Sequence, residues 1–104
     1  SSPAIMSALR SGDCDHLAAA LANDLQEPAF SLRPELREVL DAGIEFGALG
    51  GIVSGSGPTV AFLTRSAEHA LDLSVALTAS GTAPEVKRAR GPVHGAAVVT
   101  TPRD

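Results

Sequence analysis

The middle of the chain holds the feature that most restricts its fold: two short apolar runs separated by Gly, Ser, Pro and Thr. The runs at 52–53 and 60–63 contain β-branched or large apolar residues, which are typical of buried strands. Between them, Gly55 and Gly57 can adopt positive φ at little cost, and Pro58 fixes its own φ. The pattern therefore predicts a strand, a tight turn and a second strand.

This turn has two interpretations. Successive backbone N–H groups in such a turn can form a concave anion site, and the hydroxyls of Ser54, Ser56 and Thr59 could add donors. This interpretation predicts a loop that lies against phosphate, whereas the alternative is a Gly-rich turn without a ligand. Three sharper motifs fail, because the Walker A loop lacks its Lys and the dinucleotide fingerprint and nucleophile elbow lack required small residues.

Composition narrows the class of protein. A length of 104 residues suits one domain, and 44% hydrophobic residues favour a folded chain. A net charge of −4 and only three aromatic residues argue against a nucleic-acid partner. The single cysteine excludes an internal disulfide and fits a reducing cytoplasm. Because no apolar run approaches a membrane span and the start is unlike a secretory signal, we expect a cytoplasmic protein without a membrane partner.

Periodicity and capping residues predict four helices. Leu17, Leu21 and Leu25 are predicted to form the buried stripe of the second helix. We assign Ala67, Ala70, Leu71, Val75 and Leu77 to the inner side of the fourth. Their expected limits are Pro3 to Arg10, an N-cap at Asp13 to Pro28, Pro34 to Gly47, and an N-cap at Ser66 to Gly81. Further strands are expected at 85–90 and 96–100. This order favours an α+β fold, with an antiparallel four-stranded sheet and helices packed on one face.

Other groups that could carry chemistry are scattered. His16, His69 and His94 lack the spacing of a metal site, and we expect His16 and His69 to be solvated. Cys14 lies near a helix start, but the acidic residues on either side of it oppose thiolate formation, so an activated nucleophile is not expected.

The acidic residues suggest no catalytic pair. Asp24 and Asp41 are possible general bases in principle, yet nothing in the sequence supplies a partner group for either. The remaining carboxylates of the third helix most simply form its wet face.

Taken together, these features resemble the carboxyl-terminal half of GHMP-superfamily small-molecule kinases. The run from residue 54 to 59 is similar to that superfamily's third conserved motif: Ser54, Gly55, Ser56, Gly57, Pro58 and Thr59. Within the superfamily, residues 23–26, 32–36 and 86–96 are most similar to the actinobacterial kinases of the non-mevalonate isoprenoid pathway that act on diphosphocytidyl methylerythritol.

The resemblance implies that residues 1–104 are one carboxyl-terminal, ferredoxin-like domain without its ATP-binding amino-terminal domain. The absence of an initiator Met likewise suggests a processed chain or a piece of a longer one. By position, the third-motif role of propping the ATP loop near the phosphates falls on residues 54–59, and no catalytic residue carries over.

The resemblance also implies partners and cofactors. The expected partners are the chain's own amino-terminal kinase domain and a small-molecule substrate. ATP and Mg²⁺ belong to the full-length enzyme, whereas the fragment alone is expected to bind neither and to be inactive. Two alternatives stay open: the lobe of another GHMP kinase such as homoserine kinase, and a free-standing α+β module that senses a small ligand or mediates association.

Overall fold

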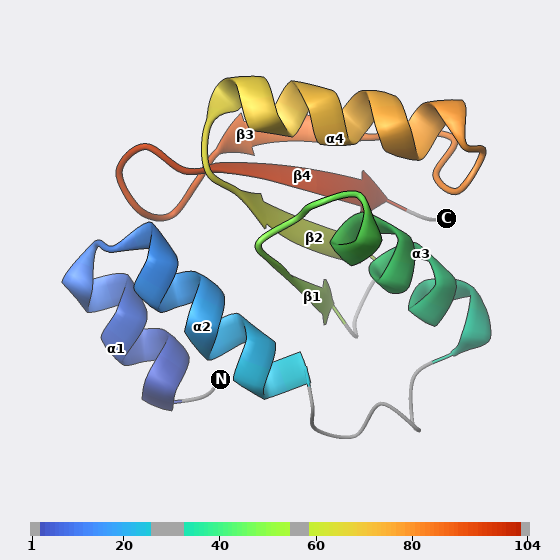
Figure 1. Ribbon diagram of the computed structural model, residues 1–104. Coiled ribbons are helices and arrows are strands. Elements are labelled where there is room, and N and C mark those ends of the chain that lie inside the picture. Colours follow the sequence, from blue (N-terminus) through green and yellow to red (C-terminus); the bar gives the residue numbers. More distant parts are fainter. Residues whose placement is uncertain (1–2, 26–32, 55–58, 103–104) are drawn as a thin grey trace.

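The computed structural model describes residues 3–25, 33–54 and 59–102 (Figure 1). In these ranges the helices are α1 (Pro3–Ser11), α2 (Cys14–Leu25), α3 (Pro34–Glu45) and α4 (Ala67–Ala79). The strands are β1 (Gly50–Ser54), β2 (Thr59–Thr64), β3 (Lys87–Arg90) and β4 (Ala97–Pro102). They form one antiparallel sheet in the order β1-β2-β4-β3, which confirms the expected α+β class. None of the described helices is long and apolar enough to cross a membrane.

Local chemistry explains where α3 and α4 begin. Pro34 occupies the first turn of α3, where its fixed φ suits a helix and its missing N–H costs nothing. Arg33 before it is extended, with φ −62° and ψ 142°, as a residue preceding proline should be. The Ser66 hydroxyl caps α4 by accepting the His69 N–H at 3.0 Å, as expected for an N-cap serine.

The main core lies between the sheet and helices α3 and α4. Its largest fully buried apolar side chains come from both layers: Val39, Val60, Phe62, Leu73, Leu77 and Val99. Because neighbouring residues of a strand face opposite sides of the sheet, Leu63 points away from this core. It packs instead into a second cluster with Leu17 and Leu21 of α2.

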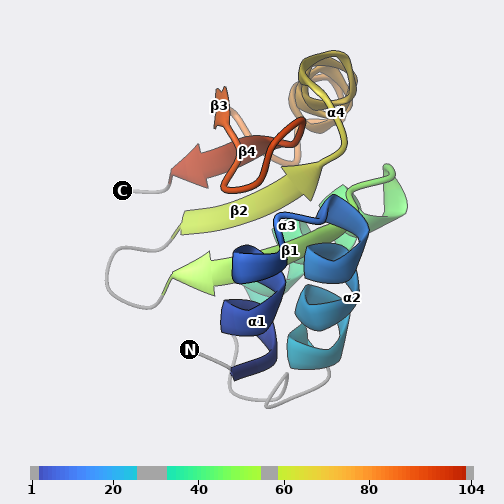
Figure 2. The ribbon, with the colours of Figure 1, turned by 90° about the vertical axis from the view of Figure 1, so that its left-hand side faces the viewer.

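The second cluster means that helices cover both faces of the sheet. Helices α3 and α4 pack on one face, as expected, and the α1–α2 hairpin covers part of the other face beside β1 (Figure 2). The addition has a simple cause, because the apolar stripe of α2 must be buried, and the face bearing Leu63 is free to receive it. Beyond the hairpin, Ile52 of β1 stays 45% exposed.

The inner side of α4 differs from the prediction. Ala67, Leu71 and Val75 were expected to point inward, but Ala67 is exposed, and Leu71 and Val75 are 46% and 57% exposed. Ala70 and Leu77 are buried as predicted, together with Leu73 and Ser74, which were not predicted. Ser74 explains the error. Its buried hydroxyl donates to the Ala70 carbonyl at 2.7 Å, and because the hydroxyl has this partner, a polar residue can lie on the core face.

Candidate functional site

The structure places the ends of the third-motif run at one end of the sheet. Ser54 ends β1 and pairs with Thr59, which begins β2 and also pairs with Pro102 of β4. The four residues between them, Gly55, Ser56, Gly57 and Pro58, lie outside the described residues. The predicted strands on both sides of the run are confirmed, and they pair with each other as a β-hairpin.

A buried hydroxyl fixes the base of this hairpin. Thr101 of β4 is 1% exposed, and its Oγ1 donates to the Val60 carbonyl at 3.2 Å. The hydrogen bond thus joins β4 to β2 at Val60, which pairs in turn with Val53 of β1. The sequence analysis missed Thr101, because a β-branched threonine in a strand has no feature that separates it from its neighbours.

Two adjacent glycines let helices approach β1 from both sides. A Cβ on Gly50 would lie 2.9 Å from Leu21 Cβ of α2, and one on Gly51 would lie 2.9 Å from Leu40 Cδ1 of α3. A Cβ at Gly50 would press on the Cβ of Leu21 and so on α2 itself, whereas one at Gly51 would displace the end of the Leu40 side chain. These glycines therefore let β1, the strand that leads to the third-motif run, lie close to both α2 and α3.

His69 stays partly exposed, in line with the prediction, and its ring also anchors the opposite end of the sheet. The backbone N–H of Arg65 donates to His69 Nδ1 at 3.0 Å, and His69 Nε2 lies 3.0 Å from the Gly47 carbonyl. Because a backbone N–H can only donate, Nδ1 must accept and Nε2 must carry the proton. The ring thus joins the start of α4 to the connection between α3 and β1.

Cys14 is not an activated thiol, in agreement with the prediction. Burial raises the pKa of the thiol, the Arg65 guanidinium lowers it by its charge, and the carboxylates of Asp15 and Asp13 raise it. The net shift is upward, so the thiolate is disfavoured. Arg65 had no predicted role here; it forms an exposed ion pair with Asp15 at 2.8 Å.

The other candidate groups are dispersed over the surface. Asp41 pairs with Arg37 at 3.2 Å on the exposed side of α3, and His16 lies 3.1 Å from the Ser11 hydroxyl near the start of α2. The side chain of Asp24 is outside the described part of the structure. Within that part, no three His, Cys, Asp or Glu side chains gather as they would around a metal ion. The described residues thus bring together no acid–base pair.

Known proteins of one family match most of this chain. The family described as GHMP kinases C terminal matches residues 5–83, from α1 past the end of α4. The chain is 57% identical over 92% of its length to a protein of Thermobifida fusca, and 57% identical over 94% to one of Mycolicibacterium smegmatis. It is 50% identical over 96% of its length to one of Mycobacterium tuberculosis.

All three relatives carry the name 4-diphosphocytidyl-2-C-methyl-D-erythritol kinase. This chain spans only 30–31% of their length. The family match covers both helices of the α1–α2 hairpin, the β1–β2 hairpin with the third-motif run, and α4. The chain therefore belongs to the GHMP kinase C-terminal family.

Proposed function

We propose that this chain is the carboxyl-terminal lobe of an ATP-dependent kinase that phosphorylates 4-diphosphocytidyl-2-C-methyl-D-erythritol in non-mevalonate isoprenoid biosynthesis. The observation that carries the proposal is the 57% identity, over 92% of this chain, to a Thermobifida fusca protein named for that activity. The lobe corresponds to about a third of that relative, which leaves the ATP-binding lobe to the remainder. A cytoplasmic location fits this role and the free cysteine.

In this proposal the lobe helps to position the ATP loop and contributes no catalytic residue. Phosphoryl transfer depends on placing the γ-phosphate and stabilising its charge, with Mg²⁺ bridging phosphate oxygens. The run Ser54, Gly55, Ser56, Gly57, Pro58 and Thr59 would support the ATP loop of the other lobe near the phosphates. The buried hydrogen bond from Thr101 to Val60, next to the run, supports such a role, because a positioning loop must be held by the packing and hydrogen bonds of its neighbours.

The sheet face that bears Leu63, where it extends beyond the α1–α2 hairpin, is here called the open face. We expect the other lobe to cover it. An apolar groove of about 250 Å³ runs between the α1–α2 hairpin and this face. Its lining includes Ile5, Leu9, Ile52, Ala61 and Val98. Ile52 lies two residues before the end of β1, next to the third-motif run, so a lobe docked here would meet that run at its border. An apolar surface of this kind is typical of an interface.

A chimeric enzyme tests the proposal. The part of the Thermobifida fusca relative that precedes the aligned region is fused to this chain and assayed with ATP, Mg²⁺ and 4-diphosphocytidyl-2-C-methyl-D-erythritol. We expect substrate-dependent ADP formation from the chimera, and none above background from either part alone. Homoserine and mevalonate serve as competing acceptors.

Two results would overturn the proposal. One is a folded chimera that forms no ADP with the named substrate, where the intact relative does so in the same assay. The other is a chimera that prefers homoserine or mevalonate, which would assign this lobe to a different GHMP kinase.

A further inference from the structure

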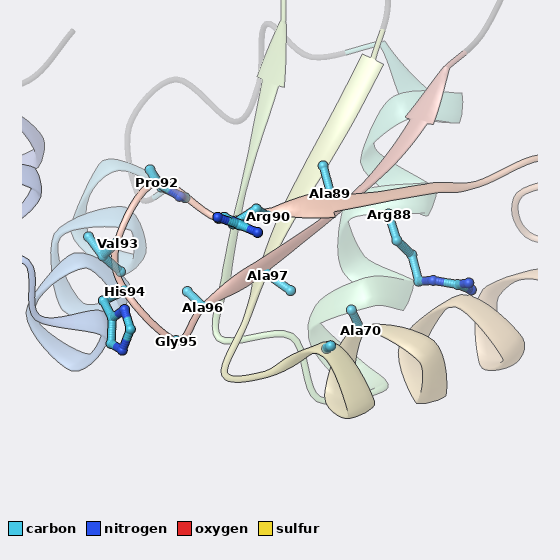
Figure 3. A pocket seen from close by; sticks show the side chains of 12 residues that line it. Ala70, Arg88, Ala89, Arg90, Pro92, Val93, His94, Gly95, Ala96 and Ala97 are labelled. Atoms are coloured by element: carbon cyan, nitrogen blue, oxygen red, sulfur yellow. The ribbon is translucent and has the colours of Figure 1, made fainter.

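A second groove lies at the end of the sheet away from the third-motif run. It has a volume of about 760 Å³ and lies between the first turns of α4 and the hairpin that joins β3 to β4 (Figure 3). The residues of its wall that matter here are Ala67, Ala70, Arg88, Arg90, His94 and Gly95. The small side chains of the wall leave the groove open to solvent. Arg88 and Arg90 come from β3, and His94 comes from the hairpin.

The charge of this groove is opposite to that of the chain. Its lining contains Arg88, Arg90 and His94 and no acidic residue, although the chain carries a net charge of −4. Among the described residues, no carboxylate forms an ion pair with Arg88 or Arg90. Both arginines therefore keep their hydrogen-bond donors available to an anion.

The arginines are spread along the groove. In Figure 3, Arg88 extends toward α4, Arg90 turns toward the hairpin, and His94 lies farther along the hairpin. Because these cations come from separate positions along β3 and the hairpin, a chain of linked anionic groups can meet them in succession.

Edge protection is the simpler explanation of these charges. Strand β3 is at the edge of the sheet, and charged edge residues such as Lys87 discourage pairing with other chains. That role, however, requires charge only somewhere on the edge. It explains neither a groove of this size nor the clustering of both arginines on the face that borders it, which strand alternation separates from the face of Lys87.

We propose that this groove binds a phosphate chain, such as the polyphosphate portion of a nucleotide or free inorganic polyphosphate. The site is separate from the third-motif run. Arg90 pairs with Ala97 and Ala97 with Thr64 at one end of β2, whereas Thr59 begins the other end, about 17 Å away at the usual rise per residue. The proposal does not rest on the proposed kinase function.

The test is a titration of the 104-residue chain with inorganic tripolyphosphate at low ionic strength, followed by calorimetry and by amide NMR shifts. We expect saturable binding that weakens with salt and shifts the signals of Arg88, Arg90 and Gly95. Arg88→Gln and Arg90→Gln should each weaken binding about fivefold, as loss of a charge-assisted contact at an exposed site does. Orthophosphate should bind more weakly than tripolyphosphate, and ATP should bind similarly to tripolyphosphate if the phosphate chain is what is recognised.

Lys87→Gln is the matched control, because it removes one positive charge from the same strand on the opposite face. It should change the affinity less than twofold. The proposal is overturned if the unmodified chain shows no saturable binding, if orthophosphate binds as tightly as tripolyphosphate, or if Lys87→Gln weakens binding as much as the arginine variants. Shifts confined to residues 50–60 would also overturn it, because they would place the anion at the third-motif run.

Discussion

Gly43 is a point of close approach between α3 and the sheet. A Cβ added there would lie 2.2 Å from two ring carbons of Phe62, a side chain with no exposed surface. In an ordinary helix, Gly→Ala stabilises by about 0.5–1 kcal/mol. Here we expect the opposite sign, with Gly43→Ala lowering the free energy of unfolding by about 1–3 kcal/mol through overpacking. Urea unfolding of the isolated chain measures the change.

A double variant separates overpacking from other effects. Phe62→Leu removes the ring that the new methyl would strike, so the two changes together should cost clearly less than the sum of their separate costs. Additive costs, or a stabilised Gly43→Ala chain, would show that the helix moves away freely and that the close approach has no energetic meaning.

The thiol of Cys14 provides a second test at the scale of one residue. Because burial and the neighbouring carboxylates raise the pKa of this thiol, its thiolate fraction near pH 8 is smaller than that of an exposed cysteine. We expect alkylation by iodoacetamide to be slower than that of glutathione at the same pH. Replacing Arg65 by Met removes the charge that lowers the pKa and should slow the reaction further. A faster reaction in that variant would contradict the assigned sign.

Gly57 is the residue at which the third-motif hypothesis makes its sharpest prediction. In the chimeric kinase, Gly57→Val should lower turnover by roughly 10²-fold, which corresponds to a loss of ~3 kcal/mol in the transition state. The matched control is Gly12→Val. Gly12 has φ +68° and an added Cβ there meets no atom within 4 Å, so valine at this position acts through backbone strain. The control should lower the melting temperature and leave turnover per folded molecule unchanged. If Gly57→Val behaves in the same way, the third-motif run only forms a turn and has no role near the phosphates.

Single residues differ in how far their sequence reveals them. Ser66 and Pro34 were correctly assigned to helix starts, because capping and proline geometry are local rules. The roles of Gly43 and His69 were not foreseen, because each depends on a contact with a residue 19 or 22 positions away. Of the third-motif run, sequence could predict the strands on both sides, since alternating or continuous apolar character is also a local property.

Among the elements, α4 has two apolar stripes, and only one of them faces the core. Leu73 on the inner stripe is 1% exposed, whereas Leu71 on the outer stripe is 46% exposed. We expect Leu73→Ala to cost about 2–5 kcal/mol of stability and Leu71→Ala less than about 1 kcal/mol. Chemical denaturation of both variants measures these costs in unfolding free energy. A larger cost at Leu71 than at Leu73 would mean that the side of α4 with Leu71 and Val75 faces the core, as the sequence predicted.

The orientation of α4 shows why some elements resist prediction from sequence. Hydrophobicity alone favours the stripe with Leu71 and Val75, because Ser74 interrupts the other one. Ser74 can nevertheless be buried, because its hydroxyl donates a hydrogen bond to the Ala70 carbonyl within the helix. The sequence alone does not show that this hydrogen bond forms. The α1–α2 hairpin is a similar case. Leu17 and Leu21 of its predicted stripe are buried and Leu25 lies outside the described side chains, but the sheet face that receives the stripe was not predicted.

At the scale of the whole molecule, Ile52 and Leu71 allow a matched test of the expected lobe interface. Both are apolar and about equally exposed, at 45% and 46%, but they lie on opposite sides of the sheet. In the chimeric kinase, Ile52→Glu should lower activity at least tenfold, because a buried unpaired carboxylate opposes docking by well over 1.4 kcal/mol. Leu71→Glu should leave activity near that of the parent chimera.

Measurements on the isolated chain complete that test. Both glutamate variants should stay folded there, because each position already meets water. Should Leu71→Glu abolish activity while Ile52→Glu leaves it intact, the other lobe would have to cover α4 instead of the open sheet face.

The strand order has a consequence for how this domain comes into being during synthesis. Strand β4 is the last of the described strands along the chain, yet it lies between β2 and β3. As the ribosome delivers the chain from its amino end, the α1–α2 and β1–β2 hairpins can form early, because their partners are neighbours in sequence. Strand β3 must wait unpaired until β4 emerges, and Phe62 stays without its cross-strand neighbour Val99 until then. The sheet is thus completed in a single late step, and until that step the nascent chain presents an open apolar edge that chaperones can recognise.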